Sequence, residues 1–256
     1  YVDTETKKVM WKPNAKLHPI YEFPIRGNDN IAGCVIIYEM PYEDKDGQIP
    51  YGMYLAGTDP YDHDESTTSS LGSTFILNKL TNRIVAEYTG RPDTANQYYE
   101  NVRRLLKFYN ARCLYENERK GLFQYLEHKH ETYLLADQPE IIKDVIQHSK
   151  VQRQKGMHMS KPLKSYGEEL IKMWLLEPYE KDGLMNLHKI RSVALLKELI
   201  SYNDIGNFDR VMAFMMVMYH LEEVKKIKVE KESKVKTIYD QDFWSKSLFS
   251  KKRRTI

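Results

Sequence analysis

The feature that most constrains this 256-residue sequence is a series of apolar strand-like segments interrupted by one helical pattern. Apolar residues recur at helical spacing in 98–109, after Pro92 and a capping residue at Asp93 or Thr94. A short strand of buried type is expected next, at 112–115. Strands and helices in this order predict a mixed α/β sheet that is flanked by helices on both faces. The predicted strands before the helix are 34–39, 51–58, and a hairpin formed by 73–78 and 83–88.

The sheet and its helices are expected to form one domain over residues 33–225. Residues 1–32 are polar and proline-dotted, which indicates an N-terminal arm or linker. Residues 226–256 are predicted to be a charged C-terminal tail, and the basic segment 148–166 is predicted to be a loop. Further helices are predicted at 119–128, 137–147, 166–176, 187–200 and 209–223.

The chain lacks the sequence signals of several classes of protein. Cys34 and Cys113 are far apart and form no zinc-type spacing, which favours reduced thiols in a cytoplasmic protein. No apolar run approaches the roughly 20 residues that a membrane span needs. No GxxxxGK[ST] pattern occurs, so the sequence has no ATPase motif. The net charge is only +3 but unevenly distributed, as expected for an enzyme that holds cations beside a polyanion.

Three carboxylates stand where functional sites tend to form. Asp59 ends a predicted strand, Glu116 follows the strand after the helix, and Asp209 lies in the first turn of the last apolar helix. Hard divalent cations such as Mg²⁺ or Mn²⁺ prefer carboxylate oxygens, and a pair of them can align water against a phosphodiester. The alternatives are structural, because Asp59 precedes Pro60 in a turn-forming pattern and Asp209 is a favourable charge at a helix start.

The run YLAGTDPYDHDESTTSSLGSTFILNKLTNRIVAEYTGRPDTANQYYENVRRLLKFYNARCLYENERKGLFQYL resembles the nuclease domain of tailed-bacteriophage terminase large subunits. The resemblance extends over roughly residues 50–225 and implies a ribonuclease H-like fold of the integrase superfamily. It implies that Asp59, Glu116 and Asp209 bind two divalent cations, with Asp59 shared between them. Relatives often carry two adjacent acids at the third position, whereas Phe208 precedes Asp209 here, and Asp204 is an alternative third ligand.

Other polar residues near these acids are candidates for secondary roles. Asp62 and Asp64 are candidate metal contacts, although a solvated acidic loop is the preferred explanation for them. Cationic side chains could bind DNA phosphates without reading sequence, and a solvated surface is the alternative for all of them. The candidate DNA-binding residues are Arg91, Arg119, Lys120, Lys155, Lys161 and Lys164.

The resemblance implies a metal-dependent endonuclease that cuts concatemeric double-stranded DNA by two-metal-ion hydrolysis during viral genome packaging. Its partners would be double-stranded DNA, the terminase ATPase domain outside this sequence, the small terminase subunit and the portal protein. The place of action would be the cytoplasm of the bacterial host. A junction resolvase or transposase-like nuclease of the same fold is one alternative. A non-catalytic module that docks on DNA or portal is the other.

Overall fold

The structure, a computed structural model, describes residues 1–6, 8–22, 30–61, 70–118, 120–146, 154–179, 183–203 and 206–245, with side chains to residue 229. Within these ranges no helix is both long and apolar enough to cross a membrane. Cys34 and Cys113 are both free thiols.

A five-stranded mixed sheet forms the centre of the molecule, with the strand order β1-β4-β3-β2-β5. Neighbouring strands are antiparallel except for β2 and β5, which run parallel. The predicted hairpin is confirmed as β3 and β4, and the predicted mixed α/β sheet is confirmed as well. The strands are β1 (Cys34–Ile37), β2 (Tyr54–Asp59), β3 (Gly72–Asn78), β4 (Arg83–Gly90) and β5 (Arg112–Tyr115).

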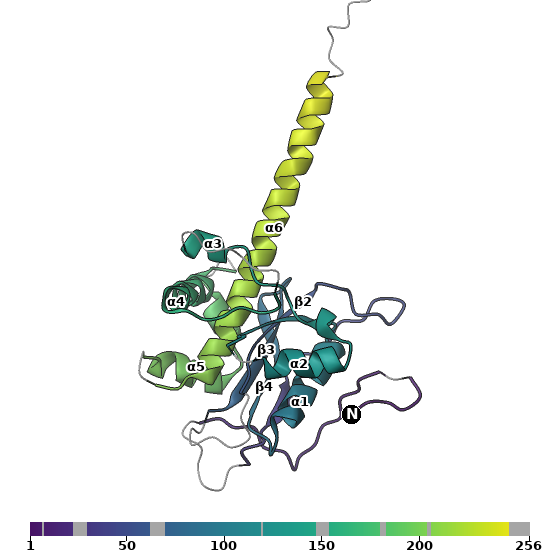
Figure 1. Cartoon of the computed structure of the whole chain (residues 1–256), viewed down its shortest axis with the longest axis vertical. Coiled ribbons are helices and arrows are strands. Elements are labelled where there is room, and N and C mark those ends of the chain that lie inside the picture. The colour runs from purple at the N-terminus through teal and green to yellow at the C-terminus, as the bar shows by residue number, and fades with distance from the viewer. Residues whose placement is uncertain are drawn as a thin grey trace, which may run out of the picture.

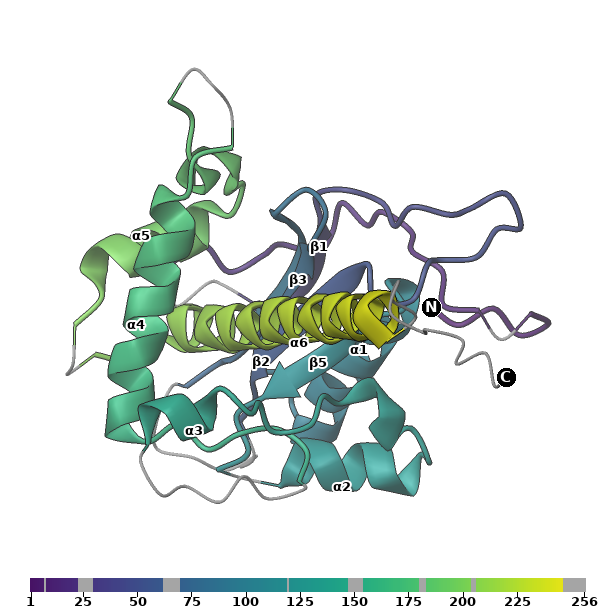
Figure 2. The same ribbon diagram turned by 90° about the horizontal axis from the view of Figure 1, so that it is seen from above.

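Helices cover both faces of the sheet, as Figures 1 and 2 show. One face carries α1 (Ala95–Phe108) and α2 (Gly121–His128), and the other carries α4 (Lys161–Leu176), α5 (Val193–Ser201) and α6 (Asp209–Ser245). Strand alternation divides the core accordingly. In β3, Phe75 and Leu77 pack in the cluster with α4 and α6, whereas Ile76 packs in the cluster with α1.

Helix α1 begins where the sequence predicts. The Thr94 side chain accepts a hydrogen bond from the Gln97 amide, so Thr94 rather than Asp93 is the N-cap. The apolar positions of the helix, including Tyr98 and Val102, are buried against the sheet. Because α1 carries the chain across this face, β5 returns parallel to β2.

Helix α6 lies directly on β2 at Gly57. A Cβ atom at Gly57 would lie 2.3 Å from the Val217 amide nitrogen and 2.6 Å from the Ala213 carbonyl oxygen. Asp209 precedes Ala213 by one helical turn, about 6 Å of rise. Asp59 follows Gly57 by two strand residues, also about 6 to 7 Å. The close contact at Gly57 therefore sets the start of α6 beside the end of β2.

Several sequence predictions differ from the structure in extent. The helix predicted over 137–147 is only α3 (Ile142–Val145), and the one predicted over 187–200 is divided into η2 (Asn186–Lys189) and α5. The division occurs because the Ser192 hydroxyl accepts from the Leu195 amide and starts a new helix. The predicted 148–166 loop contains the start of α4. Helix α6 continues past residue 223 and extends from the domain (Figure 1).

The packing of α6 on β2 can be tested at His220, because burial of this side chain makes the stability of the fold depend on pH. Its ring Nδ1 lies 3.1 Å from the Ala56 carbonyl oxygen, and burial lowers its pKa to about 4 from 6.5. Between these values the unfolded chain binds a proton that the folded chain does not, so stability is lost as pH falls. A shift of this size corresponds to about 3 kcal/mol.

When the pH is lowered from about 7 to about 4, the free energy of unfolding should fall in the unsubstituted protein. We expect it to fall less in the His220→Gln variant, because Gln binds no proton. Urea denaturation at each pH measures the difference. Equal losses in both proteins would contradict a buried neutral imidazole at this position.

Candidate functional site

Asp59 and Glu116 are brought together by the parallel pairing of β2 and β5. Thr58 is aligned with Tyr115, and the Glu116 amide donates to the Thr58 carbonyl over 3.1 Å. Each acid is the next residue along its chain, and parallel strands end at the same edge of a sheet. Both side chains are half-buried. The two residues predicted from sequence therefore stand side by side at one end of the sheet.

The protonation of this pair reflects its crowding. Burial is the largest cause that raises the pKa of Asp59 well above its usual range, followed by the negative charges of Glu116 and Asp209. Burial also raises the pKa of Glu116, while a hydrogen bond with Asp59 opposes that rise. Each of the two carboxyl groups therefore holds a proton to a higher pH than an isolated carboxyl does when no cation is present. Such a pair favours a cation in place of that proton.

Asp209 is the third acid at this end of the sheet. It is 6% exposed and lies in the first turn of α6. Its Oδ1 accepts from the Ser70 hydroxyl at 2.9 Å, and its Oδ2 accepts from the Leu71 amide at 2.8 Å. Burial raises the pKa of Asp209 to about 6 in spite of these hydrogen bonds. Since its charge also raises the pKa of Asp59, the electrostatics link the third acid to the pair.

The acids do not form a closed cage. Across the described ranges, no group of three or more His, Cys, Asp or Glu side chains is close enough together to hold one metal ion. Three further predicted candidates, Asp62, Asp64 and Asp204, lie outside the described residues. The arrangement is therefore a carboxylate pair with a third carboxylate nearby.

A buried hydroxyl cluster supports the end of β2 from the α1 side. The Tyr98 hydroxyl lies 3.1 Å from Thr58 Oγ1 and 3.0 Å from Thr74 Oγ1. Thr58 Oγ1 also donates to the Ser73 carbonyl at 2.8 Å. Hydrogen bonds among fully buried groups hold their partners firmly, because no water is available to replace them. Asp59 thus follows directly on a residue that is fixed on several sides.

Arg210, next to Asp209, anchors the start of α6 to two other segments. Its Nη1 donates to Glu198 Oε1 of α5 at 2.6 Å, and its Nη2 donates to the Ile20 carbonyl of the N-terminal arm. The guanidinium is 2% exposed, so the ion pair with Glu198 is buried. Removing one partner of a buried pair is strongly destabilising, which makes this contact a fixed support for the neighbouring acid.

Two residues near the site were missed by the sequence analysis. Glu118 adds to the negative charge that raises the pKa of both Asp59 and Glu116, and its place two residues after Glu116 was a signal available in the sequence. His158, from another segment, lowers the pKa of Glu116 through an electrostatic interaction. It gives no sequence signal, because its position depends on Met157 pairing in parallel with Glu116.

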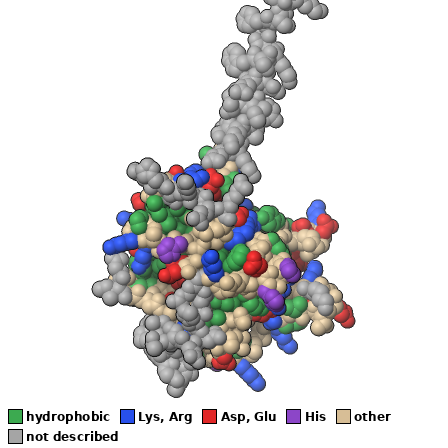
Figure 3. Space-filling model, viewed as in Figure 1, with side chains coloured by type: hydrophobic (Ala, Val, Ile, Leu, Met, Phe, Trp, Pro, Cys, Tyr) green, Lys and Arg blue, Asp and Glu red, His purple; other side chains and the backbone are tan. Residues whose placement is uncertain are grey.

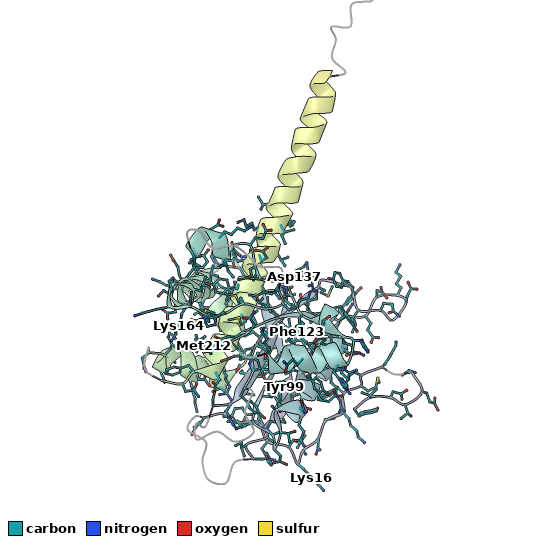
Figure 4. All side chains as sticks on the ribbon, in the orientation of Figure 1. Lys16, Tyr99, Phe123, Asp137, Lys164 and Met212 are labelled. Carbon is teal, nitrogen blue, oxygen red and sulfur yellow. The ribbon has the colours of Figure 1, made fainter. Side chains whose placement is uncertain are left out.

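The predicted DNA-binding residues are dispersed, and several make contacts within the protein. Lys155 pairs with Asp137 at 2.7 Å, and Lys164 lies 5.5 Å from the centre of the Tyr202 ring. In Figure 4, Lys164 lies with α4 and Asp137 lies on the other side of α6. Cationic and acidic side chains are interspersed on the face in Figure 3. Arg91 bonds to the Ser70 carbonyl, Lys120 and Lys161 are exposed, and Arg119 is outside the described residues.

Comparison with solved structures finds a similar architecture in the large terminase nuclease from the thermophilic phage G20c. A crystal structure of that nuclease with bound zinc is 14% identical, with a TM-score of 0.43, and the match covers 71% of this chain and 92% of the other. A second crystal structure of the same nuclease gives 14% identity, a TM-score of 0.39 and the same coverage. No protein-family model and no curated protein sequence matches the chain.

Proposed function

We propose that this chain is a divalent-metal-dependent endonuclease domain that cuts concatemeric double-stranded DNA during viral genome packaging. The observation that supports it most directly is the convergence of acids at one end of the sheet. Asp59 and Glu116 end adjacent parallel strands, and Asp209 starts the helix that crosses them. The sequence resemblance to terminase nuclease domains points the same way.

The donor set fits hard cations. All three side chains are carboxylates, which suit Mg²⁺ or Mn²⁺ and not the softer metals that prefer sulfur. Mg²⁺ is usually held by one or two carboxylates, with water and substrate phosphates completing the shell, so a closed three-ligand cage is not required. The repulsion that raises the pKa of Asp59 is what a bound cation would relieve.

In this proposal Asp59, Glu116 and Asp209 would hold the two ions, with Asp59 contributing to both, Glu116 to one and Asp209 to the other. When bound, the ions would supply an activated water and stabilise charge on the leaving oxygen. Asp59 and Glu116 are oriented by the paired ends of β2 and β5. Asp209 is oriented by hydrogen bonds from Ser70 and Leu71. The hydroxyl cluster at Thr58 fixes the end of β2, which carries Asp59.

The protein would hold DNA through contacts between cationic side chains and the phosphates of the DNA backbone. Exposed Lys120 and Lys161 are the described candidates with the freest access to phosphates, and such contacts carry no sequence information. A terminase ATPase domain, a small terminase subunit and the portal protein are the proposed partners. The proposed setting is the cytoplasm of the bacterial host during virion assembly.

Cleavage assays on several substrates test the proposal. We expect the purified protein to nick and linearise supercoiled plasmid in millimolar Mn²⁺ or Mg²⁺, to stop in excess EDTA, and to recover when the metal is restored. Cleavage that persists in EDTA would contradict metal dependence. Strong preference for a four-way junction over linear duplex would favour a resolvase. DNA binding without cleavage in either metal would favour a docking module.

A further inference from the structure

Asp209 is held from outside its own helix. Ser70 Oγ and the Leu71 amide, both from the segment that enters β3, donate to its two carboxylate oxygens. Asn207 Nδ2 makes a longer contact of 3.3 Å with Oδ2. An ionised carboxylate offers about four acceptor positions, so Oδ1, with one bond to Ser70, keeps a position for a further partner. Rotation of the carboxylate would break both short hydrogen bonds.

Ser70 is in turn held by Arg91, the residue that follows β4. Arg91 Nη1 donates to the Ser70 carbonyl at 2.6 Å, and the Arg91 amide donates to the Ile31 carbonyl, also at 2.6 Å. The guanidinium carbon lies 4.6 Å from the centre of the Tyr61 ring. Arg91 therefore connects three places on the sheet: the end of β4, the start of β3, and the residue two positions beyond β2.

We propose that Ser70 and Arg91 are positioning residues for the third carboxylate: Arg91 fixes Ser70, and Ser70 fixes Asp209 for a divalent cation. This rests on the proposed function. It differs from the role predicted for Arg91 by sequence, because the guanidinium acts through Ser70 and not by contact with DNA phosphate. Groups that orient a metal ligand typically change metal affinity or activity by 10- to 100-fold when they are removed.

The first experiment measures Mn²⁺ binding to the metal-free protein, by the loss of the electron paramagnetic resonance signal of free Mn²⁺. We expect Ser70→Ala to weaken binding by about tenfold, and Ser70→Thr, which keeps the hydroxyl, to stay within about threefold of the unsubstituted protein. Ser201→Ala is the matched control. It removes a hydroxyl that donates to the Lys197 carbonyl at the exposed C-terminal end of α5, and Mn²⁺ binding should not change.

The second experiment separates positioning from phosphate contact at Arg91. Loss of a positive charge near a cation site should by itself strengthen Mn²⁺ binding, whereas loss of positioning should weaken it. We expect Arg91→Gln to weaken Mn²⁺ binding about fivefold or more, with DNA affinity in EDTA and its salt dependence unchanged. Arg104→Gln on the outside of α1 is the control, because Arg104 pairs with Glu100 on the surface.

Cleavage kinetics give a further readout that a merely structural role would not move. In Ser70→Ala and Arg91→Gln the Mn²⁺ concentration for half-maximal cleavage should rise, while the KM for DNA should stay the same. Unchanged Mn²⁺ binding with a lower melting temperature would overturn the inference and leave the proposed function standing. A weaker salt dependence of DNA affinity in Arg91→Gln would also overturn the inference, because it indicates a lost phosphate contact. If the unsubstituted protein bound no Mn²⁺, both would be overturned.

Discussion

Asp59→Asn is expected to lower Mn²⁺-dependent cleavage by at least about a thousandfold, because transition-state stabilisation by metal ions contributes several kcal/mol. Asn keeps the size of the side chain, so the fold should be retained. DNA binding at low salt should persist, since the proposed phosphate contacts lie elsewhere. Plasmid nicking under single-turnover conditions measures the first effect, and fluorescence anisotropy in EDTA measures the second.

The same substitution should raise the stability of the metal-free protein. Burial and the neighbouring negative charges raise the pKa of Asp59 in the folded state, so folding at neutral pH places a carboxylate that is ionised in the unfolded chain where its charge is disfavoured. Asn removes that cost and the repulsion with Glu116. We expect a higher melting temperature in EDTA, and none of the Mn²⁺-induced stabilisation that mass action gives the unsubstituted protein.

Asp46→Asn is the control for both readouts. This substitution removes the same negative charge from an exposed turn between β1 and β2, at the opposite end of β2 from Asp59. Its cleavage rate and melting temperature should match those of the unsubstituted protein. Full cleavage by Asp59→Asn would refute the assignment of the site.

Gly57→Ala is expected to destabilise the protein by about 3 kcal/mol or more, the upper part of the range for overpacked cores. The added Cβ would lie 2.3 Å from the Val217 nitrogen and 2.6 Å from the Ala213 oxygen, and both are backbone atoms of α6. A backbone cannot rotate away as a side chain does, so the helix as a whole must shift. For a domain of this size the melting temperature should fall by roughly 10 °C.

The shift should also reach the site, because Asp209 lies one turn before Ala213 on the same helix. Displacement of a catalytic group by about 1 Å can lower a rate about a hundredfold. We expect Gly57→Ala to retain measurable folding at low temperature while its cleavage rate falls further than its folded fraction. Circular dichroism melting and nicking assays at one temperature compare the two.

Gly167→Ala in α4 is the matched control. Its Cβ would also meet α6, but the nearest atoms are Met215 Sδ at 3.1 Å and the Tyr219 ring at 3.2 Å, both on side chains that can adjust. The gain in helix propensity from Gly to Ala is about 1 kcal/mol and offsets that contact. The stability should therefore change by less than about 1 kcal/mol. A similar loss in both variants would contradict the role of Gly57 as the contact between α6 and β2.

Local patterns in the sequence predicted the central elements well. Strand β5 was predicted with its observed bounds, and Thr94 was one of two expected caps. Period-two apolar alternation and a capping hydroxyl act over a few residues, so they can be read without the fold. The sequence also predicted that Asp59 and Glu116 follow strands, and the parallel pairing of β2 and β5 in the structure brings these two acids to one edge of the sheet.

The sequence by itself thus determined the strands, the first helix and the two strand-end acids, because each depends on neighbours along the chain. Only the tertiary structure decided that His158 interacts electrostatically with Glu116, that α6 packs on Gly57, and that Arg91 holds Ser70. These contacts join segments tens to more than a hundred residues apart. Their geometry follows from how whole elements pack, and no local pattern of residue types encodes it.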